Sequence, residues 1–139
     1  MERDVQWLID WTSIRELTAR YNRCFDDGDI DGFTATFTPD GVMEVVGGFE
    51  AKGTEQLARM CASTPYGVVH VTTDATIDID GDRAVQDVTV LVCQRPPKDA
   101  SAEQRRSTIE RSGRYRDELV RTGEGWRFAR RTVVLDGGI

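Results

Sequence analysis

Apolar side chains near the start of the chain recur three or four positions apart, the spacing of one face of an α-helix. The members of this face are Ile14, Leu17, Tyr21 and Phe25. Ser13 and Glu16 form a capping box ahead of it, and Gly28 suits the left-handed residue that follows a helix. The pattern predicts a helix over residues 13–26, with residues 1–12 as an N-terminal extension or an additional helical turn.

Two shorter helices and a first pair of strands follow in the pattern. Asp29 is a good N-cap for a helix that runs through Phe37, and Thr54 can cap a third helix. The inner face of the third helix carries Leu57, Met60 and Cys61. The residues between these helices predict a turn and then two short strands, over 38–41, 42–46 and 49–51.

The second half of the chain is rich in β-branched residues and predicts four longer strands. They span residues 68–79, 84–93, 108–120 and 126–135. Asp80-Gly81-Asp82 supplies a hairpin turn between the first two, and the polar residues 95–106 predict a mobile loop. Helices followed by a strand meander indicate one α+β domain over residues 1–139, in which a curved sheet encloses a pocket.

Composition narrows the classes of partner. The 139 residues suit a single domain, with 39% hydrophobic and 30% charged residues as in globular proteins. The formal net charge of −6 argues against nucleic acid as a partner, and no apolar run approaches the ~20 residues of a membrane span. The three cysteines are interpreted as reduced thiols, so we expect a cytoplasmic location. One histidine and no Cys-x-x-Cys pair argue against zinc.

An acidic residue occupies an unfavourable position at the end of the first predicted helix. The C-terminus of a helix is the negative end of its dipole, yet Asp26 stands there just before Gly28. His70 is the single histidine of the chain and the natural partner for this carboxylate. A carboxylate bound to one imidazole nitrogen fixes the tautomer and stabilises the imidazolium. The two residues are therefore predicted to meet in a dry pocket as a proton-transfer pair.

Strand alternation leaves a structural interpretation of His70 open. On a regular strand His70 shares one face with Thr72 and Asp74, while Ile77 and Ile79 share the other. A polar face of this kind is consistent with the wall of a pocket and also with a solvent-exposed surface.

The acidic residues after the first helix also match half of a calcium-binding loop. Asp27-Gly28-Asp29-Ile30-Asp31-Gly32 has acids at the first, third and fifth positions of an EF-hand loop and glycine at the sixth. The twelfth position, which should supply a bidentate glutamate, is Thr38. We therefore assign no metal, and the lack of a phosphate loop or nucleotide motif predicts no cofactor.

Four segments of the chain are distinctive in combination. They are residues 19–29 (ARYNRCFDDGD), 37–41 (FTPDG), 113–115 (GRY) and 125–128 (GWRF). Together they resemble the SnoaL-like branch of the nuclear-transport-factor-2-like superfamily, and the resemblance extends from about Ser13 to Leu135. It implies a cone-shaped α+β barrel, with three helices against a strongly curved, mostly antiparallel sheet.

Within that superfamily the chain is most similar to the dehydratase type, which includes scytalone dehydratase, lindane dehydrochlorinase and bile-acid 7α-dehydratase. The resemblance implies catalytic roles for Asp26 at the end of the first helix and His70 on a strand. It implies assisting roles for Tyr21, five positions before the aspartate, and for Arg131 on the last strand. The implied activity is that of a cofactor-independent lyase, or isomerase, acting on a small, mostly apolar molecule such as a steroid, polyketide or terpenoid.

The two assisting residues have structural alternatives. Tyr21 could stabilise an oxyanion or pack in the core, and Arg131 could bind the substrate or form an ion pair. Because Arg130 is adjacent to Arg131, one of the two is expected to face water.

Other functions also fit the resemblance. The superfamily contains non-catalytic binding or assembly modules and the β subunits of ring-hydroxylating dioxygenases. Its members associate through the open face of the sheet, so we expect a homodimer or homotrimer. The alternating residues predicted to supply that face are Ala84, Gln86, Val88, Val90 and Val92.

Overall fold

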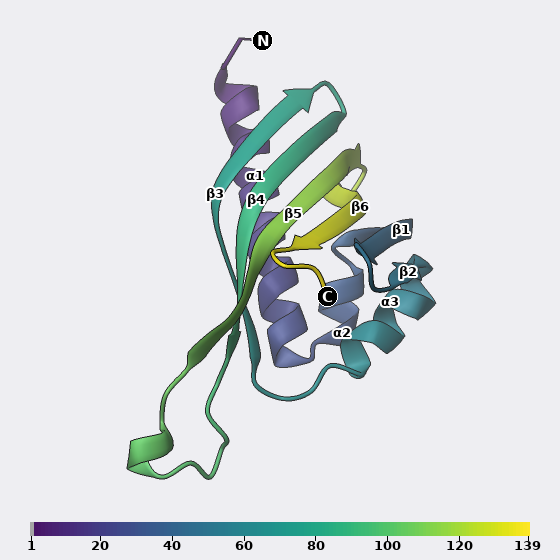
Figure 1. Ribbon diagram of the computed structural model, residues 1–139. Helices are drawn as coiled ribbons and strands as arrows, with labels where there is room; N and C mark the ends of the chain where they lie inside the picture. Colours follow the sequence, from purple (N-terminus) through teal and green to yellow (C-terminus); the bar gives the residue numbers. More distant parts are fainter. Residues whose placement is uncertain (1) are drawn as a thin grey trace.

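A computed structural model describes residues 2–139, which fold into three α-helices and one six-stranded sheet (Figure 1). In chain order the elements are α1 (Val5–Asp27), α2 (Ile30–Thr34), β1 (Phe37–Val45), β2 (Glu50–Lys52), α3 (Gly53–Ala62), β3 (Val68–Asp80), β4 (Arg83–Gln94), a 3-10 turn η1 (Ala102–Gln104), β5 (Thr108–Thr122) and β6 (Gly125–Leu135). The strands lie in the order β2-β1-β6-β5-β4-β3, and only β1 and β6 pair in parallel. The predicted α+β class is confirmed.

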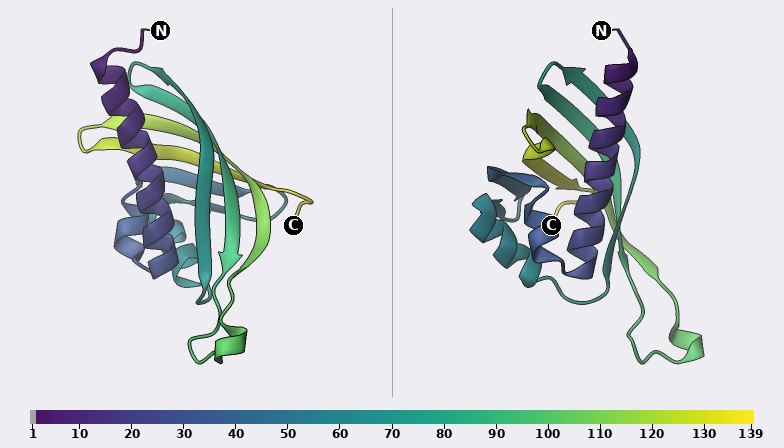
Figure 2. Two further views of the ribbon diagram at one scale, coloured as in Figure 1. Left: turned by 90° about the vertical axis from the view of Figure 1, so that its left-hand side faces the viewer. Right: turned by 180° about the vertical axis from the view of Figure 1, so that it is seen from behind.

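The sheet bends around α1, which lies along its concave face (Figure 2). α2 and α3 cover the same side beside the second half of α1, so the molecule has the predicted cone shape. The space between helices and sheet is filled by a core rich in aromatic rings, including Tyr21, Phe25, Phe33, Phe37, Tyr115 and Phe128. Burying each such ring removes a large apolar area from water and dominates the stability of the fold.

The first helix starts eight residues earlier than predicted. Asp4 is its N-cap and accepts a hydrogen bond from the backbone N–H of Trp7 at 2.8 Å. Ser13 is an interior residue whose hydroxyl bonds to the carbonyl of Ile9, so the capping box is not used. Residues 5–12 are therefore the opening turns of α1. The predicted end is confirmed, because Gly28 follows in the left-handed conformation with φ of 70°.

The short elements differ from prediction at their ends. Asp29 caps α2 as predicted, accepting from the N–H of Gly32 at 3.0 Å, but the helix ends at Thr34. The predicted turn over 38–41 is instead an irregular part of β1, where the pairing with β6 shifts register. Thr54 does not cap α3, which begins at Gly53 after an extended Lys52 without a side-chain cap.

A bulge in β3 corrects the predicted division of its two faces. The pairing with β4 shifts register between Thr73 and Thr76, and Asp74 adopts a φ of 55°. The shift turns Ile77 and Ile79 into the core, which is the same side of the sheet that His70 faces. One strand thus supplies polar side chains at the rim of the cone and apolar side chains to its interior.

Four of the five β4 residues predicted to mediate assembly are buried inside the chain itself, and the fifth, Val92, is partly buried against the same core. Ala84, Gln86, Val88 and Val90 are all at most 5% exposed and face the core on the concave side. Because they face the helices, these residues offer no surface to a second copy. The alternation of apolar residues identified an apolar face of the strand but did not show that α1 covers this face.

Residues 95–106, predicted as a loop, form a long connection containing η1 that extends away from the body of the molecule (Figure 1). In the part of the chain that is described, no helix combines the length and apolar character needed to cross a membrane.

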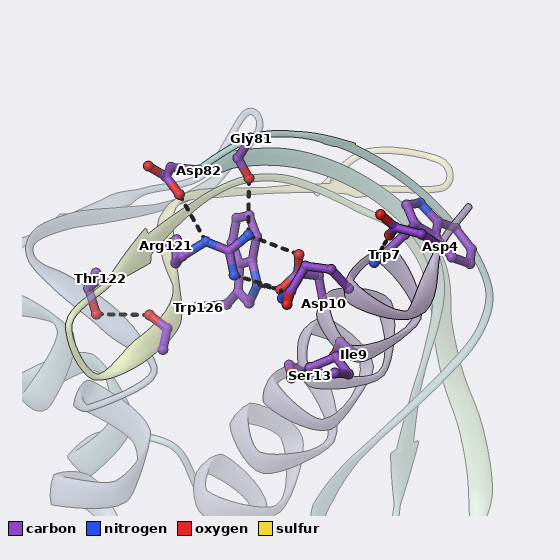
Figure 3. Close-up of polar contacts among 12 residues, drawn as sticks. Asp4, Trp7, Ile9, Asp10, Ser13, Gly81, Asp82, Arg121, Thr122 and Trp126 are labelled. Carbon is purple, nitrogen blue, oxygen red and sulfur yellow. Dashed lines mark hydrogen bonds and ion pairs between the residues drawn. The ribbon is translucent and has the colours of Figure 1, made fainter. Parts of the chain in front are cut away.

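A buried carboxylate fastens the N-terminal half of α1 to the sheet (Figure 3). Asp10 is paired through both oxygens with Arg121 of β5, at 2.6 and 2.8 Å, and accepts from the indole N–H of Trp126 at 3.0 Å. The hydrogen bonds from Arg121, followed by those from Trp126 and Gln6, lower the pKa of Asp10 to about 2 against the opposing effect of burial. Sequence reasoning missed this cluster because its members are more than 100 residues apart.

The lowered pKa of Asp10 predicts a defined loss of stability in acid. A carboxyl whose pKa falls on folding from 3.8 to about 2 stabilises the folded state by about 2 kcal/mol above pH ~4. That contribution disappears as the pH falls through about 2, because the folded carboxyl is then protonated. Urea unfolding of the wild type and Asp10→Asn should differ clearly at pH 7 and converge towards pH 2. A difference that does not change with pH would contradict the assignment.

Candidate active site

Asp26 and His70 meet at the rim of the cone. Asp26 lies in the last turn of α1 and His70 near the start of β3. One carboxylate oxygen is 2.6 Å from the imidazole Nδ1, and the other accepts from the backbone N–H of His70 at 3.0 Å. The two side chains are 8% and 12% exposed. The carboxylate is thus held at both oxygens, and the ring is fixed in one orientation.

The local fold explains why a carboxylate is tolerated at this end of the helix. The last turn of α1 has no basic residue to balance the negative end of the helix dipole. The two hydrogen bonds from His70 stabilise Asp26 in its place. The Phe25 and His70 rings pack edge-to-face, with ring centroids 4.9 Å apart. Because Nδ1 is occupied by Asp26, Nε2 is the nitrogen that can exchange a proton with a bound molecule.

A cavity of about 300 Å³ opens beside this pair. Its lining is mainly polar and comprises Ala19, Asn22, Arg23, Asp26, Asp27, Val69, His70, Thr72 and Arg95. This volume is at the lower end of the range for small-molecule sites. The sequence predicted a dry pocket enclosed by the curved sheet, but aromatic side chains fill the interior of the cone. The cavity therefore lies at the rim.

A larger hollow of about 600 Å³ lies at the opposite end of α1, beside Trp7 and the β3–β4 hairpin. It contains neither His70 nor Asp26. We therefore place the candidate site at the smaller cavity, where the titratable pair is.

Arg131 lies inside the core, away from the cavity. Its side chain is completely buried, and its Nε and Nη2 each donate to Asp117 of β5 at 2.7 Å. The guanidinium lies over three aromatic rings, with its Cζ 4.0–4.3 Å from the ring centroids of Tyr21, Tyr115 and Phe128. Burial opposes the charge of Arg131, yet the Asp117 carboxylate keeps its pKa above the ordinary value. Arg130 points the other way and pairs with Glu44 at the surface.

Tyr21 is likewise a core residue. Its hydroxyl is 3.2 Å from the sulfur of Met43, and burial raises its pKa to about 12. The four residues implied by the family resemblance therefore fall into two groups. Asp26 and His70 face the cavity, whereas Tyr21 and Arg131 lie in the core on the far side of Phe25.

The acidic segment after α1 has a structural role. Asp29 caps α2, and its other oxygen contacts the thiol of Cys24. Across residues 2–139, no three His, Cys, Asp or Glu side chains are close enough together to hold a metal ion.

Sequence reasoning missed Asn22 as a residue of the cavity, and it placed Thr72 only on the face of His70, without a partner. The Nδ2 group of Asn22 donates to the hydroxyl of Thr72 at 3.1 Å, parallel to the Asp26–His70 contact. The sequence did carry a signal for both. Asn22 is one helical turn before Asp26, and Thr72 is two strand positions after His70, so each shares its neighbour's face.

The curved sheet and the three helices on its concave side define the class of the protein, which is nuclear-transport-factor-2-like. The chain belongs to the SnoaL-like family, whose domain matches residues 6–132. It is 28% identical over 129 residues to the uncharacterized protein Rv2910c of Mycobacterium tuberculosis, a match that covers 89% of this chain and 84% of the relative.

Solved structures share this fold. An NTF2-like protein with a cystatin-like fold from Novosphingobium aromaticivorans is 28% identical, with a TM-score of 0.84 over 97% of this chain and 87% of that one. A second structure from the same organism, whose name proposes a scytalone dehydratase, is 21% identical. Its TM-score is 0.76 over 92% of this chain and 85% of its own, and at that identity the likeness shows the fold alone.

Proposed function

We propose that this SnoaL-like protein is a cofactor-independent lyase of the dehydratase type, or an isomerase, in which His70 removes a proton from carbon. The observation that carries the proposal is the 2.6 Å contact between Asp26 and His70 beside a cavity. A buried carboxylate that fixes one imidazole nitrogen leaves the other as a positioned base.

In the proposed reaction the Nε2 lone pair takes a proton from a substrate carbon. Asp26 accepts the Nδ1–H hydrogen bond and stabilises the imidazolium that forms. The electron pair of the broken C–H bond then forms a carbon–carbon double bond. A neighbouring hydroxyl departs with the electrons of its C–O bond and takes the proton from the imidazolium, so that water leaves and His70 returns to its neutral form. In an isomerisation the same pair is delocalised into an adjacent carbonyl, and the proton returns at a different carbon.

Tyr21 and Arg131 support this site indirectly in the proposal. Two donor nitrogens of Arg131 are occupied by Asp117, and the Tyr21 hydroxyl contacts Met43. These contacts favour a role in building the core beneath Phe25 and His70, rather than direct contact with the substrate.

The cavity favours an oxygenated substrate. Its lining is mainly polar and its volume is about 300 Å³. A small alcohol or ketone fits these properties, as does the oxygenated end of a steroid, polyketide or terpenoid.

The test is a screen of cyclic secondary alcohols and ketones, including steroid, polyketide and terpenoid members, in deuterated water. Proton NMR would report either a new alkene or deuterium incorporation beside the functional group. We expect the wild type to accelerate one of these for at least one compound, and His70→Gln to lose the effect. Val71→Ala, on the exposed face of the same strand, is the matched control and should stay active. Equal activity of His70→Gln and the wild type would refute the proposal.

A further inference from the structure

One face of α1 carries a polar stripe that reaches across to the sheet in three successive contacts. Thr18 accepts from Gln86 of β4 at 2.9 Å, Asn22 donates to Thr72 at 3.1 Å, and Asp26 binds His70 at 2.6 Å. The three helical residues are four positions apart, so they project from nearly the same side. The two contacts nearest the end of α1 both line the cavity of the candidate site.

Asn22 has hydrogen-bonding capacity that the protein leaves unused. The residue is 6% exposed, and its Nδ2 donates to Thr72. Its Oδ1 is buried and has no hydrogen-bond partner anywhere in residues 2–139. A buried acceptor without a donor destabilises the folded state, and natural proteins rarely keep one without a reason. The orphaned oxygen belongs to a residue that lines the same cavity as His70.

We infer that Asn22 is a specificity-determining residue that accepts a hydrogen bond from a hydroxyl group of the ligand. An amide oxygen is purely an acceptor, so the matching ligand atom must carry a proton. Asp26 is one helical turn further along α1, so a hydroxyl held by Asn22 lies close to the imidazole of His70. This inference deepens the proposed function and rests on it for the identity of the reacting end of the substrate.

The inference distinguishes an alcohol from its methyl ether, in which a methyl group replaces the hydroxyl hydrogen. A secondary alcohol can donate to Oδ1, whereas its methyl ether cannot and leaves the oxygen unpaired. A site built around a hydrogen bond to a ligand hydroxyl rejects the analogue that lacks it. For a neutral hydrogen bond the expected preference for the alcohol is about 5- to 150-fold in affinity.

The experiment compares binding of 1,2,3,4-tetrahydronaphthalen-2-ol and its methyl ether by ligand-observed NMR titration of the whole protein. The wild type should prefer the alcohol by the stated factor. Asn22→Leu should abolish the preference, and Asn22→Asp, which retains an acceptor oxygen, should keep it. Val71→Ala, on the exposed face of β3, should also keep it. Thermal unfolding of each variant confirms that a lost preference does not arise from lost folding.

Two results would overturn the inference. One is equal binding of the alcohol and the ether by the wild type, and absence of binding by both counts as the same result. It would mean that water alone satisfies Oδ1 or that the amide presents its NH2 group to the cavity. The other is a preference that survives in Asn22→Leu. Both are independent of turnover. If His70→Gln keeps its activity while Asn22→Leu loses the preference, the proposed function fails and the role of Asn22 stands.

Discussion

Replacing Asp117 with alanine is expected to destabilise the protein by about 3–5 kcal/mol, because it strands a buried charge. Asp117 and Arg131 are paired through two 2.7 Å hydrogen bonds and both side chains are completely buried. Asp117 also accepts from Gln86 at 2.7 Å, so the substitution removes a second buried partner. Since domains of this size are stable by only ~5–15 kcal/mol, the variant should be close to unfolding at 25 °C.

Urea unfolding with two comparison variants would isolate the cause. Glu44→Ala breaks the half-exposed pair with Arg130 and should cost at most about 1 kcal/mol. The double replacement Asp117→Leu with Arg131→Met removes both charges and should recover most of the stability lost in Asp117→Ala. An Asp117→Ala protein as stable as Glu44→Ala would show that the pair does not hold the core together.

Replacing His70 with glutamine is expected to lower the turnover of the substrate found in the screen by about 10²–10⁴-fold, the range supplied by a positioned base. Asp26→Asn should lower it by a comparable factor. An asparagine in that place can donate to Nδ1 and so favours the tautomer with its proton on Nε2, which cannot act as the base. The measurement is kcat under saturating substrate, with Val71→Ala as the control.

A double variant that carries both His70→Gln and Asp26→Asn tests whether the two residues act together. Because the pair acts as one unit, the double variant should be no slower than the slower single variant. Rate losses that multiply would mean that Asp26 and His70 act independently, contrary to the geometry of their 2.6 Å contact.

The sequence predicted the C-terminal end of α1 correctly and its N-terminal start wrongly, because backbone geometry decides the first and not the second. Gly28 marked the end of α1 because a left-handed residue is readily supplied by glycine. The start was misplaced because Asp4 and Ser13 are both acceptable caps by residue type. Trp7 and Trp11, which stack on each other and pack against the core, extend the buried face of the helix towards Asp4.

Helical geometry also explains which site residues could be predicted. Successive residues of a helix are ~100° apart, so Asn22 is only about 40° from Asp26 around the axis. Tyr21 is about 140° away by the same arithmetic, which directs it to the core when Asp26 faces the cavity. The family resemblance favoured Tyr21 as the residue that assists Asp26 in the site, whereas helical spacing alone would have favoured Asn22.

The partner of Arg131 could not be predicted from the sequence. The sequence predicted that one of Arg130 and Arg131 faces water, but it did not identify the residue opposite Arg131, which depends on the register of the strands. The antiparallel pairing of β5 and β6 places Asp117 directly opposite Arg131, past an irregularity between Glu118 and Leu119. Bulges shift such registers by a residue and leave little trace in the sequence.

The position of the proton on His70 tests the central claim most directly. The chain has a single histidine, so tag-free protein labelled with nitrogen-15 gives one imidazole spin system. In the neutral ring, two-bond proton–nitrogen correlations should show the proton on Nδ1, held by Asp26, and an unprotonated Nε2. A neutral ring protonated on Nε2 would contradict the account, because His70 could not then accept a proton from a molecule in the cavity.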